Sequence, residues 1–220
     1  MDTTDARNRI FARIRNAQHR PDAARENEQA AAEDYLARHP QGPRPAMPDD
    51  LVATFIGKAE ALSTTIARVQ AMQDVPAAAA QYLQANGLVT QAVAWPTLRE
   101  LDWAGVGCHV EYRKPLGEDL VGITGCFCAV AETGALMMMS GPETFASATL
   151  LPETHIAVVP ASRIVAGHED AFGLMRTERG QLSRATNFIA GPSRTADIEQ
   201  TLVLGAHGPY RVHVIIVDGA

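Results

Sequence analysis

The chain has 220 residues and a formal net charge of −6, with 46% hydrophobic and 20% charged residues. Such a composition is typical of a globular protein with one substantial domain and an extension, or with two small domains. The acidic excess argues against general nucleic-acid binding. The sequence has no run of about 18 apolar residues and no apolar signal core near its N-terminus. We therefore expect a cytoplasmic protein without a membrane span.

Two helices followed by a linker are expected in the first 48 residues. Residues 4–18 and 22–38 have helical spacing or helical propensity. Four prolines between positions 40 and 48 exclude a regular helix there. We expect residues 1–48 to form an appendage that packs on the body, on a partner or on a second copy of the chain. Residues 49–220 then form the main domain.

Helices and strands alternate through the main domain. Apolar residues spaced as on one helix face run from Leu51 to Val69 and predict a helix that Asp49 or Asp50 caps. Further helices are expected at 77–85, from Pro96, and at 144–151, 169–176 and 195–204. Strands are expected at 88–94, 106–112, 126–131, 135–139, 155–159, 188–190 and 212–217. This alternation predicts an α/β fold with a mainly parallel sheet covered by helices.

The three cysteines, Cys108, Cys126 and Cys128, indicate a reducing compartment, because their number is odd and a Cys-x-Cys pair does not easily close a disulfide. Three thiolates are fewer than the four that usually hold an iron–sulfur cluster. No histidine or cysteine near the pair has zinc-ligand spacing, so core packing is the favoured interpretation. We expect no metal and no cofactor in this chain.

Glu132, Thr133 and Gly134 separate two predicted strands, as a hairpin turn or a bulge. A carboxylate at such a turn has a defined direction and could act as a nucleophile or base. An acidic turn residue on the surface is an equally good interpretation of Glu132.

A second polar segment, from Gly191 to Thr195, lies between a predicted strand and a predicted helix. The free N–H groups of a helix start can bind an anion, and Arg194 would add further donors. The favoured alternative is helix capping by Ser193 or Thr195. His207 follows the same predicted helix, where its charge would suit the helix dipole, although it could also serve as an acid or base.

Five motifs in order resemble the lactate-utilisation protein C family, whose common unit is the LUD domain. They are Gly-Ile-Thr-Gly at 122–125, Ala-Glu-Thr-Gly at 131–134, Leu-Leu-Pro-x-x-His-Ile-Ala-Val-Val-Pro at 150–160, Gly-Pro-Ser-Arg-Thr-Ala-Asp-Ile-Glu at 191–199 and His-Gly-Pro at 207–209. The resemblance covers about residues 50–217. It implies a fold like that of sugar-phosphate isomerases and CoA transferases. It also implies a role in oxidising L-lactate to pyruvate, with the iron–sulfur clusters in partner proteins.

From the resemblance we expect a small carboxylate to be bound near these motifs, with Glu132 or His207 accepting the hydroxyl proton. The residues expected to bind it are Thr124, Thr133, Gly134, Ser193, Arg194 and Thr195. One alternative is a stand-alone enzyme like a CoA transferase or a sugar-phosphate isomerase, since a glutamate in a similar Glu-x-Gly turn forms the acyl intermediate of the CoA transferases. The other is a structural assembly factor.

Overall fold

The structure, a computed structural model, describes residues 3–20, 26–198 and 200–220. The chain divides into two compact units, Met1–Pro45 and Ala46–Ala220. The first unit contains α1 (Thr4–Ala17) and α2 (Glu26–Arg38), neither of which has a buried residue. Both predicted helices are thus present, and positions 21–25 lie outside the described residues. Residues 39–48 have no regular secondary structure, as the four prolines led us to expect.

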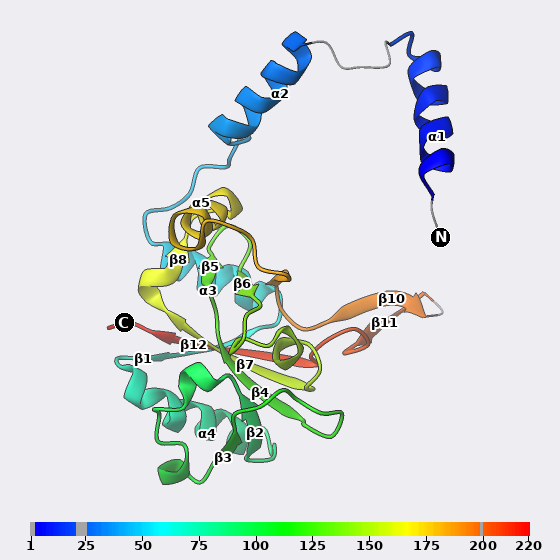
Figure 1. The fold of residues 1–220 in the computed structure, drawn as a ribbon. Coiled ribbons are helices and arrows are strands. Elements are labelled where there is room, and N and C mark those ends of the chain that lie inside the picture. The colour runs from blue at the N-terminus through cyan, green and yellow to red at the C-terminus, as the bar shows by residue number, and fades with distance from the viewer. Residues whose placement is uncertain (1–2, 21–25, 199) are drawn as a thin grey trace. The chain divides into compact units, whose positions relative to one another are not determined.

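A six-stranded sheet with only parallel pairings forms the centre of the second unit (Figure 1). Its strands, in spatial order, are β1 (Thr65–Val69), β12 (Arg211–Val217), β7 (Thr154–Pro160), β4 (Val121–Gly125), β2 (Gln91–Ala94) and β3 (His109–Glu111). The predicted α/β class with a mainly parallel sheet is confirmed.

Both faces of this sheet are buried, as expected for parallel strands. Along β12, Val214 and Ile216 face one hydrophobic core, whereas Ile215 and Val217 face the other. The core on the side of Ile215 is closed by α4 (Val75–Ala85). The core on the side of Val214 is closed by α3 (Leu51–Ala61) and by a second sheet.

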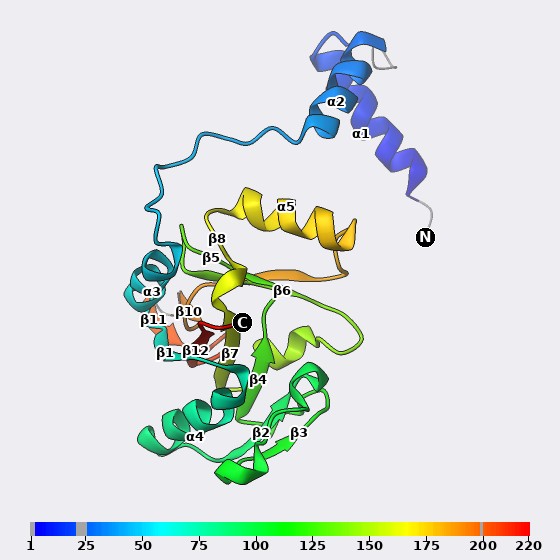
Figure 2. The ribbon, with the colours of Figure 1, turned by 90° about the vertical axis from the view of Figure 1, so that its left-hand side faces the viewer.

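The second sheet has the order β8-β5-β6-β9 and lies between the parallel sheet and α5 (His168–Arg179) (Figure 2). Its strands are β8 (Ile164–Val165), β5 (Cys128–Val130), β6 (Ala135–Met139) and β9 (Thr186–Ile189). β5 and β6 pair antiparallel, so the structure has the hairpin, one of the two alternatives predicted around Glu132. The remaining helical segments are short 3₁₀ turns at Met72–Asp74, Pro96–Leu98, Ala104–Val106, Ala146–Thr149 and Ala161–Arg163.

The predicted long helix from Leu51 is too long. Asp50 caps α3 as expected, with its side chain accepting from the Ala53 N–H, but α3 ends at Ala61. Ser63 has a φ of +67°, which turns the chain out of the helix. Ile66 and Val69 therefore lie on β1. The apolar spacing from Leu51 to Val69 belongs to a helix followed by a strand, instead of to one helix.

The predicted helix at 195–204 is wrong. This segment forms an antiparallel hairpin of β10 (Arg194–Ile198) and β11 (Thr201–Leu204) (Figure 1). Ser193 and Thr195 consequently cap no helix, and His207 follows a strand instead of a helix C-terminus. The helix predicted at 144–151 is reduced to the 3₁₀ turn at Ala146–Thr149.

Other predictions hold with shifted bounds: the helices at 77–85 and 169–176 correspond to α4 and α5. Strands β1, β4 and β8 were not predicted. No helix in the described part of the chain combines the length and the hydropathy that a membrane crossing requires.

Candidate functional site

The Glu132–Gly134 turn packs closely on α3. The Gly134 N–H donates to the Val130 carbonyl at 2.9 Å, and the Glu132 N–H donates to the Ala166 carbonyl at 3.0 Å. Gly134 has a φ of +68°, and a Cβ there would lie 2.6 Å from the Ala59 nitrogen. Only glycine fits this position, because both the backbone conformation and the contact exclude a side chain.

The second motif reaches the same end of α3 from the neighbouring strand. β9 pairs antiparallel with β6, with Leu136 opposite Ile189, so Gly191 follows β9 at the end where Gly134 precedes β6. Gly191 has a φ of +77°, and a Cβ there would overlap the Leu62 carbonyl oxygen. Two motifs more than fifty residues apart in sequence therefore pack on one helix terminus.

Ser193 ties the Gly-Pro-Ser-Arg-Thr motif to the His-Gly-Pro motif. Its N–H donates to the Pro209 carbonyl at 2.9 Å, and its carbonyl accepts from the Gly205 N–H at 2.9 Å. Its Oγ accepts from the His207 N–H at 3.2 Å. These three contacts fix the loop that carries His207 against the start of β10.

Ser193, Arg194 and His207 line one hollow of about 450 Å³, which we call the motif hollow. It is bounded by Leu62, Leu150, Phe188–Arg194 and His207–Pro209. The Arg194 side chain is exposed and contacts the α3–β1 turn, where Nη2 donates to the Leu62 carbonyl at 3.3 Å and to the Ser63 hydroxyl. A guanidinium has five N–H donors, so Arg194 retains donors for an anion in the hollow.

The other predicted site residues do not line the motif hollow. Thr124 is buried, and its Oγ1 lies 2.8 Å from His155 Nε2. Thr133 Oγ1 is buried and has no hydrogen-bond partner among the described residues. Glu132 is half-buried in the turn, and the nearly buried Thr195 lies opposite Val203 in the hairpin.

His155, on β7, is a neutral core residue. Burial lowers its pKa to about 4. The ring of His213, on β12, stacks on Tyr82 with 3.9 Å between centroids. Its Nδ1 lies 2.8 Å from Thr65 Oγ1, and burial lowers its pKa to about 4 as well.

The Cys126 and Cys128 thiols remain protonated at neutral pH. Burial raises the pKa of Cys128 to about 11, and it raises the pKa of the Cys126 thiol further. Within residues 3–20, 26–198 and 200–220, no three His, Cys, Asp or Glu side chains cluster in a way that could hold a metal ion.

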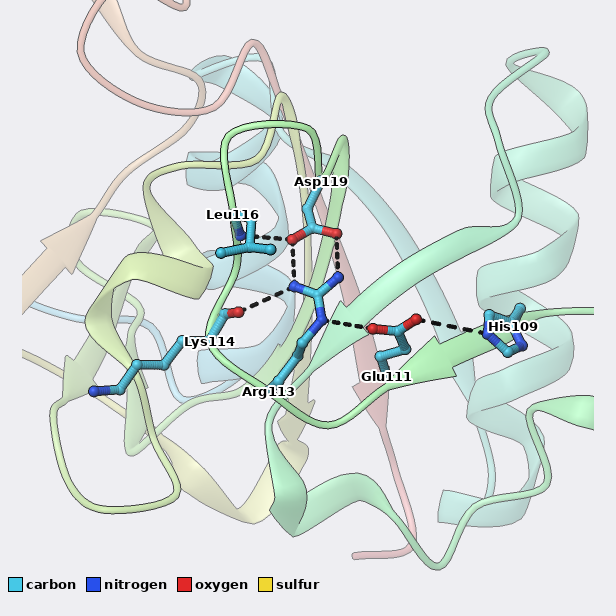
Figure 3. Close-up of polar contacts among 6 residues, drawn as sticks. All are labelled: His109, Glu111, Arg113, Lys114, Leu116 and Asp119. Carbon is cyan, nitrogen blue, oxygen red and sulfur yellow. Dashed lines mark hydrogen bonds and ion pairs between the residues drawn. The ribbon is translucent and has the colours of Figure 1, made fainter.

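Arg113 fastens the loop between β3 and β4 (Figure 3). Its guanidinium binds Asp119 bidentately, at 2.6 and 2.9 Å, and its Nε donates to Glu111 at 2.5 Å. Asp119 also accepts from the Leu116 N–H at 2.6 Å. The hydrogen bond from Arg113 is the main cause that lowers the pKa of the Asp119 carboxyl. All of these contacts lie within the loop or reach the end of β3, which indicates a structural role.

Replacing Arg113 by Met should lower the melting temperature by about 2–4 °C, because Asp119 loses its bidentate partner at a partly exposed site. Arg211→Met is the matched control, since Arg211 makes a single long ion pair with Glu153, at 3.9 Å. We expect this control to change the melting temperature by less than about 1 °C. Equal changes of the melting temperature in the two variants would show that the Arg113 contacts do not stabilise the protein more than an ordinary surface ion pair.

A larger hollow, which we call the strand-end cleft, contains none of the predicted site residues. It has a volume of about 940 Å³ and includes Trp95, Gly125 and Pro160 at the carboxyl ends of β2, β4 and β7. The rest of its lining is Thr97, Cys126, Phe127, Met139–Thr144, Arg163, Glu178, Arg179 and Gln181–Ser183. Its residues come from separate segments, and the sequence signals were the ends of the apolar strands and the last residues of two motifs, Gly125 and Pro160.

Comparison with known proteins identifies the part of the chain that carries these motifs. The LUD domain family matches residues 109–217. Lactate utilization protein C from Shouchella clausii is 42% identical over 100 residues, which are 44% of each chain. The protein of the same name from Bacillus subtilis is 36% identical over 129 residues, which are 53% of this chain and 54% of that protein.

A crystal structure of a DUF162 family protein from Deinococcus radiodurans has the same fold, with a TM-score of 0.58 at 22% identity, and covers 79% of this chain and 100% of that one. The matched region spans about half the length of the two lactate utilization proteins C above. Residues 109–217 contain the Glu132 turn, both of the motifs that Ser193 joins and every lining residue of the motif hollow except Leu62. Residues 109–217 therefore match the LUD domain family, and the chain resembles the proteins named lactate utilization protein C.

Proposed function

We propose that this protein is a component of an L-lactate utilisation system and acts with iron–sulfur protein partners in the oxidation of lactate to pyruvate. One observation carries the proposal. Ser193, Arg194 and His207 converge on the motif hollow in a chain whose relatives are named lactate utilization protein C. In this proposal the chain is a non-redox subunit that binds the small carboxylate, and the iron–sulfur clusters belong to the partners.

The chemistry of the motif hollow suits a 2-hydroxy acid. The Arg194 guanidinium offers a planar pair of donors for the carboxylate. The His207 ring is the acid–base group for the hydroxyl, because its loop is fixed by the bond from the His207 N–H to Ser193 Oγ. Oxidation to the 2-oxo acid removes two electrons and two protons. We assign the hydroxyl proton to His207. The two electrons and the C2 proton go to the iron–sulfur protein partners.

Titration calorimetry with L-lactate tests the binding step. Arg194→Ala should weaken lactate binding by about tenfold or more, since a charge-assisted bidentate contact is lost. Arg194→Lys should recover only part of the affinity, because an ammonium keeps the positive charge but lacks the paired N–H donors of the guanidinium. Arg176→Ala, at an exposed position in the last turn of α5, is the control and should bind as the unsubstituted chain does. Unchanged binding by Arg194→Ala would contradict the assignment.

Lactate-dependent dye reduction by the purified iron–sulfur partners, with and without this chain, tests the wider role. We expect reduction to require the chain and to be lost with Arg194→Ala but retained with Arg176→Ala. Full activity of the partners alone would overturn the proposed role as a subunit, whatever the calorimetry shows.

A further inference from the structure

The strand-end cleft lies where open parallel sheets place their ligands. Trp95 follows β2, Gly125 ends β4 and Pro160 ends β7, so the three carboxyl ends open into one space. In α/β folds this edge of the sheet is the usual binding position. A volume of about 940 Å³ is within the range of small-molecule sites and far exceeds what a three-carbon acid fills.

The acidic side chains of the cleft are already neutralised. Glu178 is held by the Arg163 guanidinium, with contacts of 2.5 and 3.0 Å. Arg163 also donates to the Phe127 carbonyl at 2.9 Å and lies over the Phe127 ring. Glu143 accepts from Arg99 at 2.9 Å. Each carboxylate therefore has its own cation, and neither pair leaves a net charge for a ligand.

Arg179 supplies the remaining charge. It lines the cleft from the last turn of α5 and is exposed. Within the described ranges of the chain it takes part in no hydrogen bond or ion pair, although its charge helps to lower the pKa of the neighbouring Glu178. The cleft thus presents one net positive charge, which matches a ligand with a single negative charge.

Part of the cleft lining is apolar, and two of its residues are aromatic. Trp95 and Phe127 form part of its lining, and both are largely buried, at 3% and 8% exposure. Leu182, 58% exposed, lies on the same lining near the cationic end of α5. Such a surface favours a ligand whose body is apolar or planar.

We propose that the strand-end cleft binds an organic monoanion larger than lactate, an aryl carboxylate whose carboxylate pairs with Arg179 and whose ring packs toward Trp95 and Leu182. This site is separate from the motif hollow, because the two linings share no residue. The proposal therefore stands or fails independently of lactate binding.

The chain has two tryptophans, which allows a direct test. Trp103 is buried in the core on the side of α4, so Trp103→Phe leaves Trp95 as the only indole reporter. Titration of this variant with 1-naphthoate should quench Trp95 fluorescence with saturation. The neutral 1-naphthalenemethanol, which lacks the carboxylate, should bind at least about fivefold more weakly.

Substitutions in the same background assign the contacts. Arg179→Gln should weaken 1-naphthoate binding about fivefold or more and leave the neutral alcohol unaffected. Arg176→Gln, three positions earlier on the same helix and outside the lining, should leave both unchanged. Leu182→Asp should weaken 1-naphthoate binding by repulsion. Absence of saturable quenching, or equal affinity in Arg179→Gln and Arg176→Gln, would overturn the proposal.

Discussion

Gly134→Ala should destabilise the second unit by roughly 3 kcal/mol or more. Two costs add at this position. A φ of +68° is unfavourable for alanine, and the new Cβ would lie 2.6–2.9 Å from backbone atoms of Lys58 and Ala59. Backbone cannot rotate away as a flexible side chain does, so α3 would have to move off its core. Denaturant unfolding followed by circular dichroism measures the loss.

Gly87→Ala is the control that separates these two costs. Gly87 has a similar φ of +63°, but a Cβ there meets nothing within 4 Å. We expect this variant to lose only about 1 kcal/mol, the conformational cost alone. If Gly134→Ala lost no more than Gly87→Ala, the packing of the Glu132 turn on α3 would be incorrect.

Gly191→Ala extends the argument to the second motif. Its Cβ would overlap the Leu62 carbonyl oxygen at a φ of +77°, so a loss similar to that of Gly134→Ala is expected. Because both changes displace the same helix terminus, the double variant should lose less than the sum of the two single losses. Strict additivity would mean that the two motifs do not share α3 as their support.

The sequence predicted the elements of the sheet better than it predicted the segments that position the motifs. Strands 155–159 and 212–217 were recognised because each is apolar apart from one histidine, and they became β7 and β12. The helix from Leu51 was extended to Val69 because Ile66 and Val69 happened to continue its spacing. The β-branched Thr64, Thr65 and Ile66 were the opposing signal, and the turn at Ser63 has no glycine to mark it.

The hairpin at β10 and β11 was misread for a related reason. Ala, Glu and Gln favour a helix, and the turn contains Gln200 at a φ of +56° where glycine or asparagine would have marked a hairpin. Ser193, Arg194 and His207 were each proposed, but on the assumption of a helix start and a helix end. What brings them together is the pairing of β10 with β11 and the hydrogen bonds of Ser193, neither of which a linear pattern contains.

Acid should destabilise the protein through two buried histidines, and this is the second large effect we expect. The folded-state pKa values of His155 and His213 are both about 4, whereas an unfolded histidine titrates near 6.5. Protons therefore bind more tightly to the unfolded chain between these values. Stability is complete above pH 6.5 and falls as the pH drops toward 4, by roughly 2 kcal/mol per histidine at pH 5.

The two rings have different surroundings. His155 has a neutral partner in Thr124, and its Nδ1 has no partner among the described residues, so nothing stabilises a second proton. His213 stacks on Tyr82, and its Nε2 is likewise buried without a described partner. In both cases desolvation of the charged ring is the main cause of the lowered pKa.

Urea unfolding at pH 7.5 and pH 5.0 checks this prediction. The unsubstituted chain should lose roughly 4 kcal/mol between the two values, and His213→Phe, which keeps a ring against Tyr82, should lose about half of that. The comparison stops at pH 5 because Asp119, whose pKa Arg113 lowers, adds a carboxylate contribution at lower pH. A pH dependence that is the same in the parent and in His213→Phe would mean that His213 is not buried as a neutral ring. The stacking on Tyr82 would then be incorrect, and with it the packing of α4 on β12.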